Sequence, residues 1–149
     1  YHHRYGEPHA ERMALADAGD KAKGATAYVT LEPCCHTGKT PPCSDGLIEA
    51  GVAEVVVAMT DPNPLVAGKG IAQLRAAGIN VIEDVLNTDA QAINPGFIKR
   101  MAEQKPYVRL KLGMSLDART AMASGESQWI TGDAARHDVQ KLREEVLVC

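Results

Sequence analysis

The chain has 149 residues, of which 45% are hydrophobic and 23% are charged, and its formal net charge is −3. This length suits about one domain, and this composition excludes a disordered tail, a collagen-like fibre and a coiled coil. The small negative charge argues against nucleic acid as the main partner. Since no apolar run approaches the roughly 18 residues of a membrane span and no signal segment opens the chain, we expect a cytoplasmic protein without a membrane partner.

Helices and strands alternate along the first hundred residues. Apolar and turn-forming residues predict strands at 26–31, 54–59 and 79–82, and helices at 9–18, 44–50, 70–77 and 88–104, the last interrupted at 94–96. Strands that alternate with single helices imply right-handed crossovers and a mostly parallel sheet with helices on its faces. Sites in such sheets form beyond the carboxyl ends of the strands, so we look for chemistry in the loops after Leu31 and Met59.

Lys105 and Pro106 mark the predicted boundary between two domains, 1–104 and 105–149. Beyond them, the stretch 107–112 alternates like a strand, and 131–145 has the pattern of an amphipathic helix. The chain opens on Tyr1 without a Met and closes on an apolar run at 146–149. We therefore expect a fragment in which the first domain lacks its start and the second lacks its end.

Three short motifs carry candidate metal chemistry: His9-Ala10-Glu11, Glu32-Pro33-Cys34 and Pro41-Pro42-Cys43. One imidazole and two thiolates form a good zinc donor set that leaves a fourth position for water. Zinc lowers the pKa of such a water to about 7, and a carboxylate such as Glu11 can accept the proton and pass it to a substrate. His-x-Glu followed by Pro-Cys is the arrangement of zinc nucleobase deaminases.

Each motif alone also has an ordinary structural explanation. A lone His-x-Glu is usually a helix surface, and cytosolic cysteines are more often small buried side chains than ligands. A closed structural zinc site needs four ligands in tighter pairs, for which Cys35 is a spare candidate. Eight residues separate Cys34 from Cys43, whereas nucleoside deaminases usually have two. Another zinc nucleoside or nucleobase deaminase and a non-catalytic zinc-binding module therefore stay open as alternatives.

The segment from Thr30 to Cys43 closely resembles the zinc loop of the bifunctional riboflavin-biosynthesis deaminase/reductase family. The resemblance continues through most of the chain, in the stretches 6–11, 61–64 with Gly68 and Gly70, 94–97, 111–117 and 121–131. It implies an α/β architecture: a cytidine-deaminase-like three-layer α/β/α domain with a mostly parallel sheet, followed by the start of a dihydrofolate-reductase-like domain that uses NADPH. The family also suggests a homo-oligomer.

The resemblance implies roles for individual residues of the first domain. His9, Cys34 and Cys43 would bind Zn²⁺, and Glu11 would be the catalytic proton shuttle. The reaction would be hydrolytic deamination of 2,5-diamino-6-(5-phosphoribosylamino)pyrimidin-4-one, a phosphorylated pyrimidine on the route to riboflavin. The family's substrate contacts match five residues here: His2, His36, Lys39, Asp61 and Asn63.

The second domain would begin the reductase, which reduces the ribosyl group of the deaminated product. There Ser127 and Arg143 match substrate contacts, Gly113 and Trp129 match contacts to NADPH, and Lys111 is a further candidate contact. From sequence alone, Trp129 suits core packing and Arg143 suits a helix surface. One departure is Ala118, which stands where the family usually has Gly after Asp117.

Overall fold

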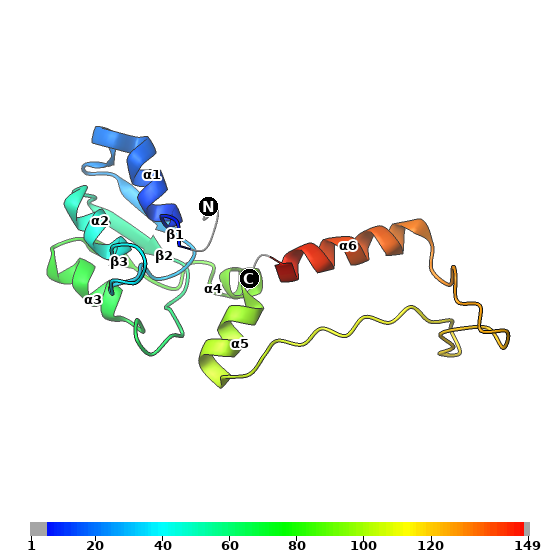
Figure 1. Cartoon of the computed structure of the whole chain (residues 1–149). Helices are drawn as coiled ribbons and strands as arrows, with labels where there is room; N and C mark the ends of the chain where they lie inside the picture. Colours follow the sequence, from blue (N-terminus) through cyan, green and yellow to red (C-terminus); the bar gives the residue numbers. More distant parts are fainter. Residues whose placement is uncertain (1–5, 148–149) are drawn as a thin grey trace. The chain divides into compact units, whose positions relative to one another are not determined.

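The structure is a computed structural model that describes residues 6–147, with side chains as far as residue 144. The chain divides into two compact units that separate between Pro106 and Tyr107 (Figure 1). His2, one of the predicted substrate contacts, lies outside the described residues. Within residues 6–147, no helix combines the length and the apolar character that crossing a membrane requires.

The first unit contains a three-stranded parallel sheet in the order β1-β2-β3. The strands are β1 (Thr26–Val29), β2 (Glu54–Val57) and β3 (Asn80–Ile82). Helix α2 (Cys43–Glu49) connects the first two strands, and α3 (Lys69–Ala76) connects the second and third. The predicted parallel sheet with single crossover helices is therefore confirmed.

The core of this unit lies between the sheet and its crossover helices. Val55 and Val57 on the central strand are fully buried and belong to one apolar cluster with Leu47 of α2 and Leu74 of α3. Burying each such side chain contributes roughly 1.5–3 kcal/mol. Because β-branched residues at 55–57 favour the extended conformation, they form the central strand of the sheet. This core supports the strand ends from which the candidate site projects.

The remaining helices of the first unit follow the predicted local signals. Helix α1 (Ala10–Ala18) begins after His9, and a 3₁₀ turn, Gly19–Ala22, follows it. Helices α4 (Asn87–Ile93) and α5 (Pro95–Glu103) are separated at Asn94, whose φ is −130° and ψ 55°. The break has a local cause, because a residue that precedes proline disfavours helical geometry while proline itself suits the first helical position.

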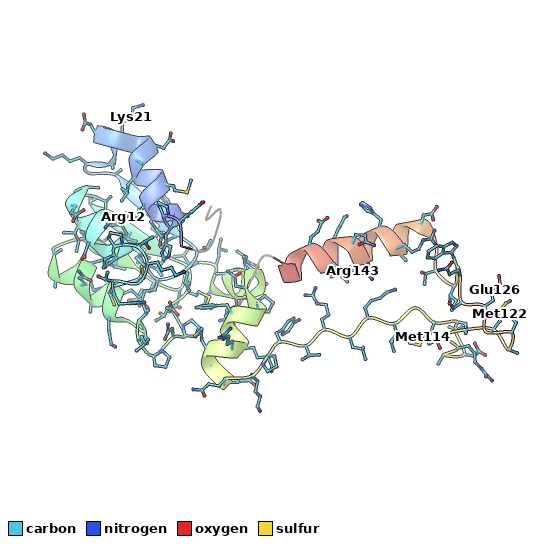
Figure 2. The ribbon with its side chains drawn as sticks, viewed as in Figure 1. Arg12, Lys21, Met114, Met122, Glu126 and Arg143 are labelled. Carbon is cyan, nitrogen blue, oxygen red and sulfur yellow. The ribbon has the colours of Figure 1, made fainter. Side chains whose placement is uncertain are left out.

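The second unit consists of an extended segment with turns and one helix, α6 (Asp133–Leu147). The predicted strand at 107–112 is wrong for the described structure, since its backbone has no strand partner between residues 107 and 147. Val108 and Leu110 are 78% and 79% exposed, and Met114 and Met122 stand out from the same segment (Figure 2). Alternating apolar residues become a strand only when a neighbouring strand pairs with them.

Candidate metal centre

Three side chains from separate parts of the first unit converge on one point. His9 precedes α1, Cys34 lies in the loop after β1, and Cys43 is the first residue of α2. The Nδ1 atom of His9 lies 3.6 Å from Cys34 Sγ and 3.3 Å from Cys43 Sγ. The three donor atoms all lie within 4.8 Å of one another.

This donor set fits a zinc ion. Zinc bonds of about 2.3 Å to sulfur and about 2.0 Å to nitrogen place neighbouring tetrahedral ligands about 3.5 Å apart. The observed nitrogen–sulfur distances of 3.6 and 3.3 Å have that spacing. Among the described residues the cluster has three members, which is the protein ligand number of catalytic rather than structural zinc.

The surroundings of the two sulfur atoms shift their pKa values in opposite directions. The pKa of Cys34 is lowered to about 5, first because the Cys43 thiol donates a hydrogen bond to it and further because the backbone N–H of Cys43 and the His9 ring favour the thiolate. The pKa of Cys43 is raised, because its thiol is the donor of that bond and is buried. The pair therefore holds a thiolate at neutral pH, which is the form that binds metal.

Glu11 lies beside this cluster, on the first turn of α1. The negative charge of its carboxylate contributes to the raised pKa of Cys43. The position two residues after His9 therefore places an acid–base group at the edge of the donor set. A carboxylate there can exchange protons with a ligand that occupies the fourth position of the metal.

Backbone and side-chain hydrogen bonds hold the two sulfur-bearing segments together. The N–H of Cys43 donates to Cys34 Sγ over 3.3 Å, and the N–H of Ser44 donates to the Cys34 carbonyl over 3.1 Å. Arg12, labelled on α1 in Figure 2, donates to the Pro42 carbonyl over 2.8 Å and pairs with Glu49 of α2 at 3.3 Å. Arg12 thus connects the helix that carries His9 and Glu11 to the start of the helix that carries Cys43.

The four predicted substrate contacts that the structure describes lie in two loops at the carboxyl ends of β1 and β2. His36 and Lys39 are exposed in the first loop, while Asp61 is buried and Asn63 half-buried in the second. Burial raises the pKa of Asp61, a hydrogen bond from the Asn63 backbone opposes that shift, and His36 lies close enough to act on the same carboxyl group. The loops also meet directly, because the Glu32 N–H donates to the Met59 carbonyl over 2.9 Å. Cys35 is half-buried and is not a member of the donor cluster.

In the second unit, all five predicted reductase residues line one open hollow of about 680 Å³: Lys111, Gly113, Ser127, Trp129 and Arg143. Trp129 is 68% exposed, so the core-packing interpretation of this residue is wrong for the described structure. The guanidinium of Arg136 stacks 4.3 Å from the centre of the indole ring. Cationic side chains beside an aromatic face suit an anionic ligand that carries an aromatic ring.

Sequence reasoning missed three residues that hold the loops and helices around the candidate site together: Arg12, Glu32 and Ser44. Glu32 and Ser44 are buried; Glu32 is the first residue of the motif that ends at Cys34, and Ser44 directly follows Cys43. The signal that could have found Glu32 is its place immediately before Pro33-Cys34, where a charged residue directly follows the predicted strand 26–31. No local sequence pattern could identify Arg12, because its partners lie 30 and 37 residues away in the chain.

Comparison with known proteins gives matches across both units. Residues 2–59 match the family described as "Cytidine and deoxycytidylate deaminase zinc-binding region", and residues 106–148 match the "RibD C-terminal domain". The riboflavin biosynthesis protein RibD of Haemophilus influenzae is 65% identical over 96% of this chain and 38% of its own length. This chain belongs to the RibD family. The predicted family and the cytidine-deaminase-like α/β fold are confirmed.

Solved structures of the RibD family agree with this fold. RibD of Acinetobacter baumannii has a TM-score of 0.88 at 60% identity and covers 93% of this chain, which in turn covers 39% of that protein. A protein from Thermotoga maritima, described as a diaminohydroxyphosphoribosylaminopyrimidine deaminase/5-amino-6-(5-phosphoribosylamino)uracil reductase, has a TM-score of 0.88 at 45% identity over 95% of this chain and 41% of its own. The chain therefore spans about two fifths of the length of its RibD relatives.

Proposed function

We propose that the first unit contains the deaminase centre of a riboflavin-biosynthesis enzyme, with His9, Cys34 and Cys43 as the zinc ligands and Glu11 as the proton shuttle. The observation that carries the proposal is the convergence of one imidazole and two sulfur atoms within 4.8 Å, with a carboxylate beside one of the sulfurs. The domain that contains this centre would span residues 1–104, and the reductase domain would begin at 105.

The substrate of this proposal is 2,5-diamino-6-(5-phosphoribosylamino)pyrimidin-4-one. Zinc, when bound, lowers the pKa of a water molecule to about 7 and so supplies hydroxide at neutral pH. Glu11 would accept one proton of that water and deliver it to a ring nitrogen of the pyrimidine, while the remaining hydroxyl adds to the carbon that bears the amine. Glu11 would then take the proton of this hydroxyl and pass it to the amine, so that the C–N bond breaks, a carbonyl forms and ammonia leaves. Water and substrate are thereby converted to the deaminated pyrimidine and ammonia, with no change in oxidation state.

The loops after β1 and β2 would bind the rest of the substrate. Lys39 provides a cation for the phosphate, and His36 contributes a second polar group from the same loop. The Asp61 and Asn63 side chains offer acceptors and donors for the ribose or the aminopyrimidine. His2, outside the described residues, completes the set that the family resemblance implies.

Two alternatives are less well supported. A non-catalytic zinc module would need a fourth protein ligand, and Cys35 is absent from the cluster formed by the described residues. A deaminase that acts on nucleic acid would need a basic groove with aromatic stacking residues, whereas the exposed cation of the zinc loop is the single Lys39. The open donor set beside Glu11 favours a small phosphorylated substrate.

Replacing Glu11 by Gln in the full-length gene product tests the proposal. The variant retains the metal ligands but cannot accept a proton, so ammonia release from the phosphorylated pyrimidine should fall by about 10²–10⁴-fold while zinc content stays unchanged. Asp17→Asn, at an exposed position on the same helix, is the matched control and should keep full activity. Unchanged ammonia release in Glu11→Gln would reject the proton-shuttle role.

For the second unit, we propose that the hollow beside Trp129 is part of the reductase site, which uses NADPH. Its cationic side chains Lys111 and Arg143 would bind phosphate groups, Ser127 would contact substrate, and Gly113 and Trp129 would contact the cofactor. NADPH, when bound, supplies a hydride to the ribosyl group of the deaminated product.

Replacing Arg143 by Ala in the full-length gene product tests this assignment. The KM of the reductase reaction should rise and ammonia release should stay unchanged; the opposite pattern would refute the assignment. A homo-oligomer in the cytoplasm stays a prediction.

A further inference from the structure

We infer that Glu32 is a positioning residue that fastens the loop carrying Asp61 and Asn63 to the metal-ligand loop, and so determines how the pyrimidine is held. The inference rests on the proposed function, because it concerns the substrate side of that same site. Glu32 stands two residues before Cys34 but does not belong to the donor cluster. Its role follows from what its carboxyl group contacts.

Glu32 is 2% exposed, and both of its carboxyl oxygens accept backbone hydrogen bonds. Oε2 accepts from the N–H of Asp61 over 3.1 Å and from the N–H of Gly68 over 2.8 Å. Oε1 accepts from the N–H of Ile71 over 3.1 Å. A buried carboxylate is costly unless such donors surround it, so these three bonds explain how the group is kept in the interior.

Two of the three bonds cap the amino-terminal end of helix α3, whose own N-cap residue provides no side-chain hydrogen bond. Its N-cap residue is Gly68, with φ +82° and no side chain, and its first turn contains no acidic residue. The first N–H groups of a helix need acceptors from outside the helix, and an anion there also interacts favourably with the helix dipole. Glu32 supplies that cap from 36 to 39 residues away, so α3 is attached to the zinc loop rather than closed locally.

A close backbone approach next to Glu32 tightens the same junction. A Cβ atom on Gly70 would lie 2.0 Å from the Pro33 carbonyl oxygen, a distance that no side chain can tolerate. Pro33 joins Glu32 to Cys34 in the sequence. The start of α3 therefore packs directly against the peptide that leads into a metal ligand, and movement of one segment displaces the other.

The third bond, from the N–H of Asp61, holds the loop that contains the predicted substrate contacts Asp61 and Asn63. With its N–H held by Glu32, Asp61 accepts the N–H of Asn63 through Oδ1 over 2.8 Å, and Asn63 accepts the N–H of Leu65 through its own Oδ1 over 3.1 Å. These bonds leave Asp61 Oδ2 and the Asn63 amide nitrogen as the atoms that can meet a ligand. Glu32 thus sets the orientation of two substrate-binding groups without touching the substrate itself.

Replacing Glu32 by Gln in the full-length, zinc-loaded gene product tests this role. In the glutamine side chain an NH₂ group replaces one of the two carboxyl oxygens, and this group cannot accept a hydrogen bond from a backbone N–H. At least one of the three bonds is therefore lost. We expect KM for the phosphorylated pyrimidine to rise about tenfold, kcat to change less than about threefold, and zinc content to stay at the wild-type level. Amide hydrogen exchange at Asp61, Gly68 and Ile71 should accelerate.

Glu54→Gln is the matched control. Glu54 also accepts side-chain hydrogen bonds, from Asn80 over 2.6 Å and from Thr26 over 3.4 Å, but at the amino end of the sheet. It should leave KM unchanged. Loss of zinc from Glu32→Gln, or an unchanged KM at full zinc content, would overturn the inference.

A measurement on the wild-type protein covers the case in which Glu32→Gln does not fold. The amides of Asp61, Gly68 and Ile71 should exchange slowly in the zinc-loaded wild type, because each donates to a buried oxygen; fast exchange would overturn the inference. An inactive wild-type enzyme with slow exchange at these amides would instead reject the proposed function.

Discussion

The two units use their apolar residues in opposite ways. In the first, side chains from two strands and two helices bury one another, and the loops above that core bring three metal donors together. In the second, apolar side chains alternate along an extended segment and stay exposed, although the predicted reductase residues still share one hollow. The comparison teaches that predicted contact residues can share an open hollow without a packed core, whereas a metal centre with fixed donor distances requires a closed core beneath it.

The largest effect should follow from removing a sulfur of the first unit. Cys43→Ser in the full-length gene product replaces a fully buried sulfur ligand by a hydroxyl, which is a much weaker zinc donor, so bound zinc should fall at least about tenfold, with loss of ammonia release. Metal analysis after dialysis measures this. Cys35→Ser, outside the donor cluster, should keep the wild-type zinc content, and equal losses in both variants would contradict the three-residue site.

Paired truncations of one leucine in each unit measure the difference in packing. Leu47→Ala creates a cavity in the core, where this side chain is 1% exposed, and should lower the free energy of unfolding by about 2–5 kcal/mol. Leu110→Ala, at a side chain 79% exposed, should change it by less than about 0.5 kcal/mol in the 149-residue chain. Urea denaturation followed by far-UV circular dichroism provides both values. Similar losses would show that the second unit has a packed core of its own.

A smaller effect is expected at a turn of the second unit. Ala118 has φ +64°, the left-handed conformation that favours glycine, and the family usually has Gly at this position. The N–H of Ala118 donates to the Ser115 carbonyl over 2.9 Å, so the turn retains this geometry despite the extra methyl group. Ala118→Gly should relieve about 0.5–1 kcal/mol of strain. Slower hydrogen exchange at the backbone amide of residue 118 in the variant would show that the turn is more stable, and faster exchange would contradict the prediction.

The smallest effect concerns the charge on Asp61. Burial raises its native-state pKa above the ordinary value of 3.8, so ionisation is less favourable in the folded protein than in the unfolded chain. The contribution of this group to stability is therefore present below pH 3.8 and is lost as the pH rises through the native pKa. Asp61→Asn keeps the acceptor for Asn63, so wild type should become less stable relative to this variant between pH 4 and 7. Urea denaturation of both proteins across that range measures the difference in their free energies of unfolding. A wild type that became more stable relative to the variant as the pH rose would contradict the prediction.

The sequence by itself determined the order of elements in the first unit and the chemical identity of its candidate site. Strands 26–29, 54–57 and 80–82 and the break at Asn94 follow from β-branched runs, glycine and proline, which act over a few residues. His9, Glu11, Cys34 and Cys43 were identifiable because three short motifs, each ordinary alone, together supply one imidazole, two thiols and a carboxylate.

Only the tertiary structure decided which groups support that site. Glu32 and Arg12 act on partners 29 to 39 residues away, and no local pattern encodes a bond that depends on how a strand, a loop and a helix meet. The predicted strand at 107–112 failed for the same reason, since its apolar alternation is local but pairing requires a second strand. Propensity is a property of neighbouring residues, whereas burial, register and buried hydrogen bonds are properties of the assembled core.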